Sequence, residues 1–227
     1  MELLGRNLET IFNYCNRKFS LKTVLLLLDQ MVRALERLHT KSYVHRDIKP
    51  ENFVIGVGKK EGMVNLIDFG LSRRFRDKIS GLHTPYRVQK SFIGTVRYAS
   101  INAHFGVEQS RKDDLESLGH VMLYFLKGSL PWQNIKEENK AKKYEEIMKK
   151  KISTPLNVLC KDLPEEFQQY MTYCRGMKFN QRPDYRYIIR IFKQLALKQG
   201  IEYNSIYDWS LPDLISLEVT LFLIFRN

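Results

Sequence analysis

Two short segments contain polar residues whose types and spacing suit one chemistry, the transfer of a phosphoryl group from a metal-bound nucleotide. The first segment is HRDIKPEN at residues 45–52, and the second is DFG at residues 68–70. In-line phosphoryl transfer requires little covalent work from a protein, so catalysis depends on positioning the acceptor hydroxyl and neutralising charge at the phosphate oxygens. The two segments therefore form a candidate active site.

Each polar residue of these segments has a candidate role. Asp47 can receive or orient the proton of an acceptor hydroxyl, and Lys49 can reach the transferring phosphate as a point charge. Asn52 and Asp68 offer oxygen ligands of the kind that Mg²⁺ prefers. An isolated DFG is a common turn, and charged loops often follow helices, but both segments in this order favour function over chance.

A helix must deliver the first segment to the site. Ser20 is a suitable N-cap, and the helix is expected to run to about His39. Its buried face is predicted from apolar residues at three- and four-residue steps, namely Val24, Leu28, Met31, Leu35 and Leu38.

A two-stranded hairpin is expected to set the distance between Asn52 and Asp68. Asn52–Ile55 and Val64–Ile67 are short β-prone runs, and the Gly-rich connection at 56–62 is typical of a turn. One metal ligand then lies next to each strand.

The rest of the chain is predicted to be mainly helical. Ser72–Asn102 has no sustained period and reads as a functional loop with aromatic and apolar anchors such as Tyr86, Phe92 and Tyr98. Helical apolar spacing then recurs in Leu115–Leu126, Lys140–Lys150, Glu165–Arg175 and Tyr185–Lys198.

Composition limits the class of protein. The chain has 227 residues, 44% of them hydrophobic, and a net charge of +12, which favours polyanionic partners such as acidic peptides, phosphopeptides or nucleic acid. The basic runs at 140–143 and 149–151 are expected to be solvated helix faces. No groove-reading motif supports nucleic-acid binding.

Cysteine content and hydropathy indicate the compartment. Cys15, Cys160 and Cys174 lack metal-ligand spacing and are predicted to be reduced thiols in the core. No apolar run is long enough to span a membrane, and the first residues do not resemble a secretory signal. A cytoplasmic or nuclear location is expected, with no membrane partner.

The order of motifs resembles the larger lobe of eukaryotic protein kinases, and several strings are more narrowly similar to the casein kinase I family. The resemblance runs from about residue 1 to residue 213, and SIN at 100–102, where most kinases carry APE, is its sharpest mark. The matching strings are LLG (3–5), LE (8–9), HRDIKPEN (45–52), DFGL (68–71), GTVRYASIN (94–102), EQSRKDDLESLG (108–119) and GSLPWQ (128–133). The resemblance implies a mainly α fold with a short β-hairpin, and a serine/threonine kinase that uses ATP and Mg²⁺ on acidic or already phosphorylated proteins.

The resemblance also assigns roles outside the two segments. Leu3, Leu4, Val54 and Ile67 match the hinge and the floor of the adenine site, so they are expected to bind the nucleotide's base. They are also expected to form a contiguous apolar surface that invites a partner or self-association.

Basic residues match positions that bind substrate anions in the family. Arg97, Lys90 and Lys143 together could hold a phosphate near the acceptor site, since Arg offers a bidentate fork and Lys a point charge. Ordinary surface basicity is the alternative, with most force for Lys143.

Two further positions concern the support of the catalytic loop. Asp114 looks like the helix carboxylate that braces this loop through backbone hydrogen bonds, the alternative being a solvated charge. In typical kinases the Glu of APE pairs with a late Arg, but Asn102 cannot supply that charge for Arg182. Arg182 therefore needs another partner.

The sequence departs from the family in its first part. It contains no Gly-x-Gly-x-x-Gly and no strand Lys of the Val-Ala-Ile-Lys type, and Met1 falls where the family's interlobe hinge begins. We expect a single kinase-like domain at 1–213 without the N-terminal β-lobe, a divergent tail at 214–227, and little or no activity from the chain alone. A non-catalytic module that binds acidic or phosphorylated peptides is the alternative function.

Overall fold

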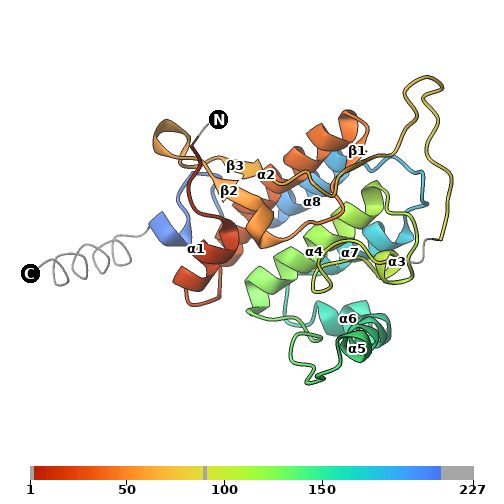
Figure 1. Cartoon of the computed structure of the whole chain (residues 1–227). Coiled ribbons are helices and arrows are strands. Elements are labelled where there is room, and N and C mark those ends of the chain that lie inside the picture. The colour runs from red at the N-terminus through yellow and green to blue at the C-terminus, as the bar shows by residue number, and fades with distance from the viewer. Residues whose placement is uncertain (1–2, 89–90, 211–227) are drawn as a thin grey trace, which may run out of the picture.

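The computed structural model describes residues 3–88 and 91–210, and it is mostly helical with two short two-stranded sheets (Figure 1). This confirms the expected mainly α fold with a short hairpin. The predicted tail at 214–227 lies outside the described residues. In chain order the elements are α1 (Leu8–Tyr14), α2 (Leu21–Thr40), β1 (Tyr43–Val44), β2 (Phe53–Ile55), β3 (Val64–Leu66), β4 (Arg73–Arg74), α3 (Ile101–His104), α4 (Arg111–Lys127), α5 (Lys140–Ser153), α6 (Leu156–Leu159), α7 (Glu165–Gly176) and α8 (Tyr185–Lys198), with short 3₁₀ turns at Pro50–Asn52, Gly58–Lys60 and Asp208–Ser210.

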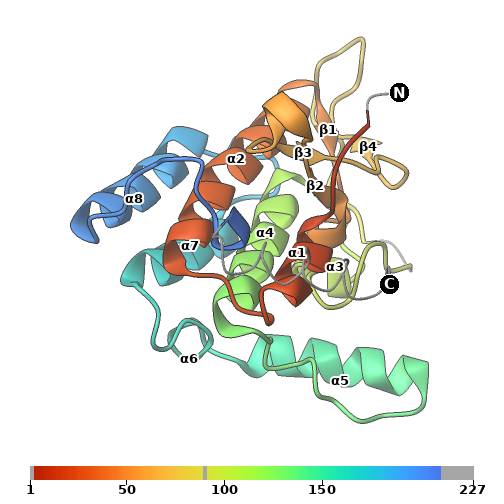
Figure 2. The same cartoon turned by 90° about the vertical axis from the view of Figure 1, so that its left-hand side faces the viewer.

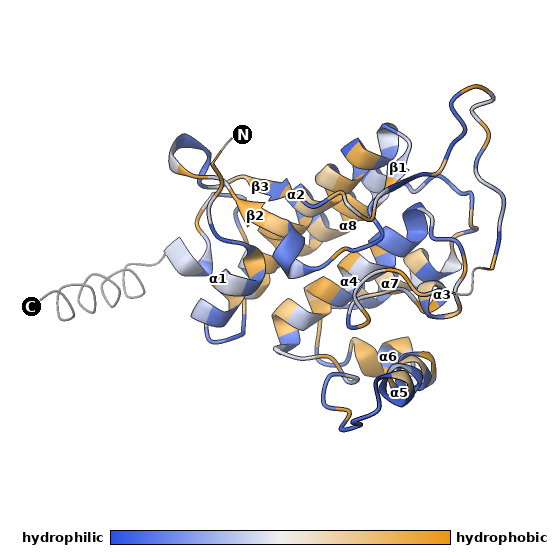
Figure 3. Cartoon of the chain, in the orientation of Figure 1, coloured by the Kyte–Doolittle hydropathy of each residue, from blue (hydrophilic) through white to orange (hydrophobic). Residues whose placement is uncertain are grey.

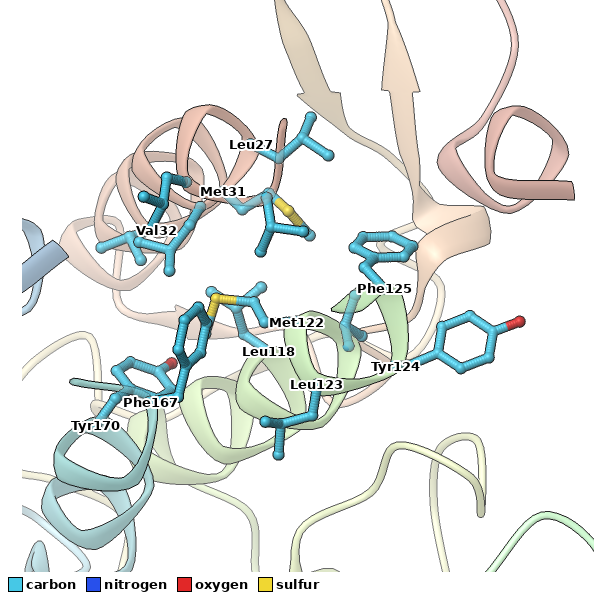
Figure 4. Close-up of a cluster of buried hydrophobic side chains, with 14 of the residues drawn as sticks. Leu27, Met31, Val32, Leu118, Met122, Leu123, Tyr124, Phe125, Phe167 and Tyr170 are labelled. Atoms are coloured by element: carbon cyan, nitrogen blue, oxygen red, sulfur yellow. The ribbon is translucent and has the colours of Figure 1, made fainter. Parts of the chain in front are cut away.

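Helix α4 forms the centre of the molecule and packs on α2 and α7 (Figure 2). Leu118 and Met122 of α4 lie between Met31 of α2 and Phe167 of α7, and all four side chains are buried (Figure 4). At Gly119, a Cβ atom would come within 2.2 Å of the Met171 sulfur, so a larger residue would have to displace that buried side chain. Hydrophobic residues follow β2 and the inner faces of α2 and α4 (Figure 3).

The predicted helix that precedes the first segment is confirmed as α2. The Ser20 hydroxyl accepts a hydrogen bond from the Thr23 amide at 3.2 Å, which is the N-cap that the sequence indicates. The four later predicted helices correspond to α4, α5, α7 and α8, of which α4 begins earlier, at Arg111. Helices α1, α3 and α6 were not predicted, because each is too short to display a clear apolar period.

The predicted hairpin is also confirmed, with β2 and β3 antiparallel and Val54 opposite Asn65. Asn52 closes a 3₁₀ turn instead of starting the strand. The N-terminal segment pairs with the other edge of β2, since the Gly5 amide donates to the Ile55 carbonyl at 2.8 Å. Both edges of β2 are thus paired, one with β3 and the other with the N-terminal segment.

The basic run at 149–151 is not wholly solvated, which corrects the prediction for Lys151. This side chain is fully buried, and its Nζ donates to the carbonyls of Val96 at 2.8 Å and Ala99 at 2.6 Å. It also lies 5.1 Å from the centre of the Trp132 ring. These acceptors replace water and tie α5 to the segment before α3.

The anchors predicted in the long loop differ in burial. Tyr98 is 1% exposed and Phe92 packs on His104, but Tyr86 is 60% exposed and is a poor anchor. The thiols of Cys15, Cys160 and Cys174 are free and buried, as predicted. Within residues 3–88 and 91–210, none of the helices combines the length and the apolar content that a membrane span requires.

Two histidines are held neutral near the buried amine of Lys151. His120 is completely buried in α4, and its Nδ1 bonds to the Tyr98 carbonyl at 2.8 Å. Burial, and secondarily the charge of Lys151, lower the pKa of His120 well below 6.5 and that of His104 to about 3.

Acid should therefore weaken the fold through these histidines. The unfolded chain takes up protons on them below about pH 6.5 while the folded chain does not, so the stability they contribute is complete above that pH and is lost as the pH falls towards 3. In urea unfolding at pH 7.5 and 5.5, wild type should lose about 1.4 kcal/mol more than His104→Phe. Tyr144→Phe, which alters the same cluster without removing a histidine, should follow wild type. Parallel pH profiles for wild type and His104→Phe would contradict this account.

Candidate active site

The two predicted segments meet at one place because backbone and side-chain bonds hold them together. The Ile67 amide donates to the Asn52 carbonyl at 2.9 Å, which closes the base of the hairpin. His45 Nε2 donates to the Ile67 carbonyl at 3.0 Å, and Arg46 Nε donates to the Leu71 carbonyl at 2.7 Å. The loop at 45–49 and the loop at 68–71 are therefore fixed relative to each other.

Asp47 lies at the centre of this arrangement, and its two carboxylate oxygens have different partners. Oδ2 is 2.7 Å from Lys49 Nζ, and Oδ1 accepts a hydrogen bond from the Thr95 hydroxyl at 2.6 Å. The residue is 7% exposed. A largely buried carboxylate thus pairs with an amine on one side and an alcohol on the other.

The sequence did not single out Thr95, although it lies in the quoted string at 94–102. Its approach depends on Gly94, whose φ of +111° is unfavourable for residues with a side chain. A Cβ atom at this position would lie 2.5 Å from the Arg46 carbonyl oxygen. The turn before Thr95 can therefore press against the catalytic loop only with glycine, and a glycine before a hydroxyl residue was the available signal.

The predicted metal ligands are arranged so that oxygen atoms remain available. Asn52 Nδ2 donates to the Asp47 carbonyl at 2.9 Å, which leaves its amide oxygen for another partner. Asp68 is exposed, has a φ of +60°, and accepts from the Gly70 amide at 3.2 Å through one oxygen. In the part of the chain that the structure describes, no three His, Cys, Asp or Glu residues gather in a metal-binding cluster. One carboxylate and one amide suit Mg²⁺, which usually keeps waters and phosphate oxygens as its other ligands.

The charge of Lys49 is stabilised by acids from both loops of the site, at 45–52 and at 68–71. Burial alone lowers the pKa of this ammonium group, but the hydrogen bond to Asp47 and the charges of nearby acids outweigh burial and leave the pKa raised. Asp68 is one of those acids. The amine of Lys49 is therefore held in its charged form by the surrounding acids, chiefly Asp47.

Asp114 braces the catalytic loop from below. Its carboxylate accepts from the His45 amide at 2.7 Å, the Arg46 amide at 2.8 Å and His39 Nε2 at 2.9 Å, and it is 1% exposed. Burial by itself raises the pKa of Asp114, but the bond to His39 and the bonds from the loop outweigh it and lower that pKa. The hydrogen bonds expected from the sequence are thus present, and the solvated alternative does not apply.

The four residues predicted to bind the base and to form an apolar surface differ in exposure. Leu3 is 79% exposed, Leu4 and Ile67 are partly exposed, and Val54 is only 6% exposed. An exposed position is therefore wrong for Val54, whose side chain is buried in the fold. A cavity of about 390 Å³ opens beside Ile55, and none of these four residues lines it.

Two of the three predicted anion-binding residues, Arg97 and Lys143, lie in the described part of the chain. Arg97 is half-buried, with its guanidinium 5.6 Å from the Tyr98 ring centre and 5.7 Å from that of Tyr124. Lys143 is exposed on α5. Lys90 lies outside the described residues. The joint anion site of these three residues therefore stays a prediction.

The family model of the protein kinase domain matches residues 1–191. This match covers most of the chain and includes both segments of the site and the brace at Asp114. The chain therefore belongs to the protein kinase family.

Removing the charge at Asp114 should destabilise the fold. In Asp114→Asn, an amide NH₂ replaces one acceptor oxygen and faces groups that are themselves donors, so at least one buried N–H loses its partner. We expect the free energy of unfolding in urea to fall by about 2–4 kcal/mol. Asp162→Asn, the same change at an exposed position, should stay within about 0.5 kcal/mol of wild type. Equal stabilities of the two variants would show that the brace is energetically unimportant.

Proposed function

We propose that this member of the protein kinase family is a serine/threonine kinase of the casein kinase I type, which transfers the γ-phosphoryl group of ATP to acidic or already phosphorylated proteins. The observation that carries the proposal is the pairing of Asp47 with Lys49 on one side and with an alcohol, Thr95, on the other. The casein kinase I assignment is supported by the strings at 94–102 and 108–119.

The acceptor side of the reaction depends on Asp47. Its Oδ1 already accepts a hydrogen bond from the hydroxyl of Thr95, which is the same kind of donor as a serine or threonine of a substrate. Asp47 orients the acceptor hydroxyl and takes its proton, while Lys49 neutralises charge at the phosphate. Since Lys49 is held in its charged form, it needs no protonation step for that role.

The nucleotide side depends on Asn52 and Asp68, which would hold Mg²⁺ bound to ATP. The ion supplies charge neutralisation at the phosphate oxygens. The short connection between the loops, through the Ile67 amide and the Asn52 carbonyl, keeps the two ligands in register. Asn52 precedes β2 and Asp68 follows β3, so both lie at the open end of the antiparallel hairpin, which supports this assignment.

Substrate preference is assigned to the basic residues beyond the acceptor site. The guanidinium of Arg97 is fixed by a 3.3 Å bond to the Tyr98 hydroxyl and by two aromatic rings, so it loses little freedom on binding an anion. Lys143 and Lys90 add long-range attraction for acidic or phosphorylated segments.

Nucleotide binding is the first test of this function. ATP should bind more tightly with Mg²⁺ than without it, and Asp68→Asn should remove most of that difference because it removes the charged ligand. Isothermal titration calorimetry of wild type, Asp68→Asn and the exposed control Asp162→Asn measures this directly. An ATP affinity that changes neither with Mg²⁺ nor with the Asp68→Asn substitution would refute the proposal.

Turnover is measured in the same preparation with an acidic casein-type peptide. The 227-residue chain should incorporate little phosphate, because its sequence contains no Gly-rich loop and no strand Lys to hold the phosphates. Each missing charge-assisted contact costs about 1.5–3 kcal/mol, roughly tenfold to a hundredfold in binding. Substantial turnover that Asp47→Asn abolishes would show that the expected low activity is wrong.

Peptide selectivity separates a kinase from a non-catalytic module that only docks phosphopeptides. Fluorescence polarisation should show tighter binding of a phosphorylated peptide than of its unphosphorylated twin, and Lys143→Gln should reduce this preference about two- to fivefold. Lys142→Gln, an adjacent exposed change on α5, serves as the control and should have no effect. An undiminished preference in Lys143→Gln would remove Lys143 from the proposed site, and selective binding without Mg²⁺-dependent nucleotide binding would favour the module.

A further inference from the structure

Three arginines surround a small cavity below the catalytic loop that none of the roles above uses. The cavity measures about 140 Å³ and is lined by Arg76, Arg111, Arg182, His39, Thr40 and Tyr185. It lies where α2 ends and where α4 and α8 begin. Both α4 and α8 direct the positive ends of their dipoles towards this region.

Arg111 is built into the wall of the cavity. It is 4% exposed, its guanidinium lies 4.5 Å from the Phe75 ring centre, and one Nη donates to the Asn180 carbonyl at 2.7 Å. Its Nε is buried and, among the described residues, has no hydrogen-bond partner. A buried donor without an acceptor is costly, and a bound anion or an ordered water would supply one.

The charge around the cavity is unbalanced. Burial lowers the pKa of Arg111, and repulsion from Arg76 and Arg182 lowers it further, so the three guanidinium groups interact. Neither Arg76 nor Arg182 forms an ion pair within the described residues, and the lining contains no carboxylate. Two acids lie near Tyr185 without lining the cavity. Asp114 is fully engaged by His39 and by two amides of the catalytic loop, and Glu36 lies on α2.

We propose that this cavity is a binding site for a tetrahedral oxyanion of the phosphate type, held by Arg76, Arg111 and Arg182. A dianion balances the repulsion between the arginines and gives the buried Nε of Arg111 its acceptor. Guanidinium forks match the geometry of phosphate oxygens better than any other side chain. The anion would also give Arg182 a negatively charged partner, which the uncharged side chain of Asn102 cannot provide. The site requires neither nucleotide nor catalysis, so it stands apart from the proposed function.

Inorganic phosphate is the first probe, titrated at constant ionic strength and followed through the ¹⁵N-resolved Nε–H signal of Arg111. We expect a saturable shift. Arg182→Gln and Arg76→Gln should each weaken binding roughly tenfold, because each removes one charge-assisted contact. Both residues are exposed, so these variants should fold, which circular dichroism verifies. Arg190→Gln, an exposed arginine on the same helix as Tyr185, is the matched control and should bind like wild type.

A shift that does not saturate, or equal affinities in Arg182→Gln and Arg190→Gln, would overturn the proposal. Lys143→Gln should leave this signal unchanged, which separates the cavity from the proposed substrate site. A second arm compares phosphate with a phosphoserine peptide. If the peptide binds at least tenfold more tightly and loses this advantage in Arg182→Gln, the natural ligand is carried on a protein. If the two bind alike, the cavity takes a free anion.

Discussion

The buried carboxylate of Asp114 is the interaction on which the active site depends. It accepts bonds from two consecutive backbone amides of the catalytic loop and from His39. Arg46 has a φ of +69°, a conformation that a loop maintains only where its surroundings compensate for the strain. The carboxylate supplies this compensation and determines the direction in which the following residue, Asp47, enters the site.

The brace is in turn part of a longer chain of hydrogen bonds. The Tyr185 hydroxyl lies 2.6 Å from His39 Nδ1, and His39 Nε2 lies 2.9 Å from Asp114. With Nε2 protonated towards the carboxylate, Nδ1 accepts from the tyrosine. Three helices, α2, α4 and α8, therefore meet through polar groups directly under the loop that carries the chemistry. The apolar packing of α4 on α2 and α7 keeps water away from this junction.

The sequence predicted those features that depend on local pattern. Helix α2 and the hairpin follow from apolar period, an N-cap and a Gly-rich turn, and the order of HRDIKPEN and DFG was enough to predict that Asp47 and Asp68 belong to one site. Features that depend on distant partners were not predictable in this way. The second edge of β2 is paired by residues 5–7, and Thr95 reaches Asp47 only because Gly94 permits a close turn. Lys151 can be buried because the carbonyls of Val96 and Ala99 accept its hydrogen bonds and the Trp132 ring lies beside its amine. None of these partners is adjacent in sequence, so no local pattern reveals them.

Burial also changes the chemical behaviour of Lys151. Its amine is completely enclosed, and burial lowers the pKa of this group well below 10.5. Reagents that acylate amines can reach exposed lysines such as Lys142 at any time, but they can reach Lys151 only while α5 is detached from the chain around Val96. The rate at which Lys151 is acylated would therefore report how often α5 separates from this segment by local unfolding.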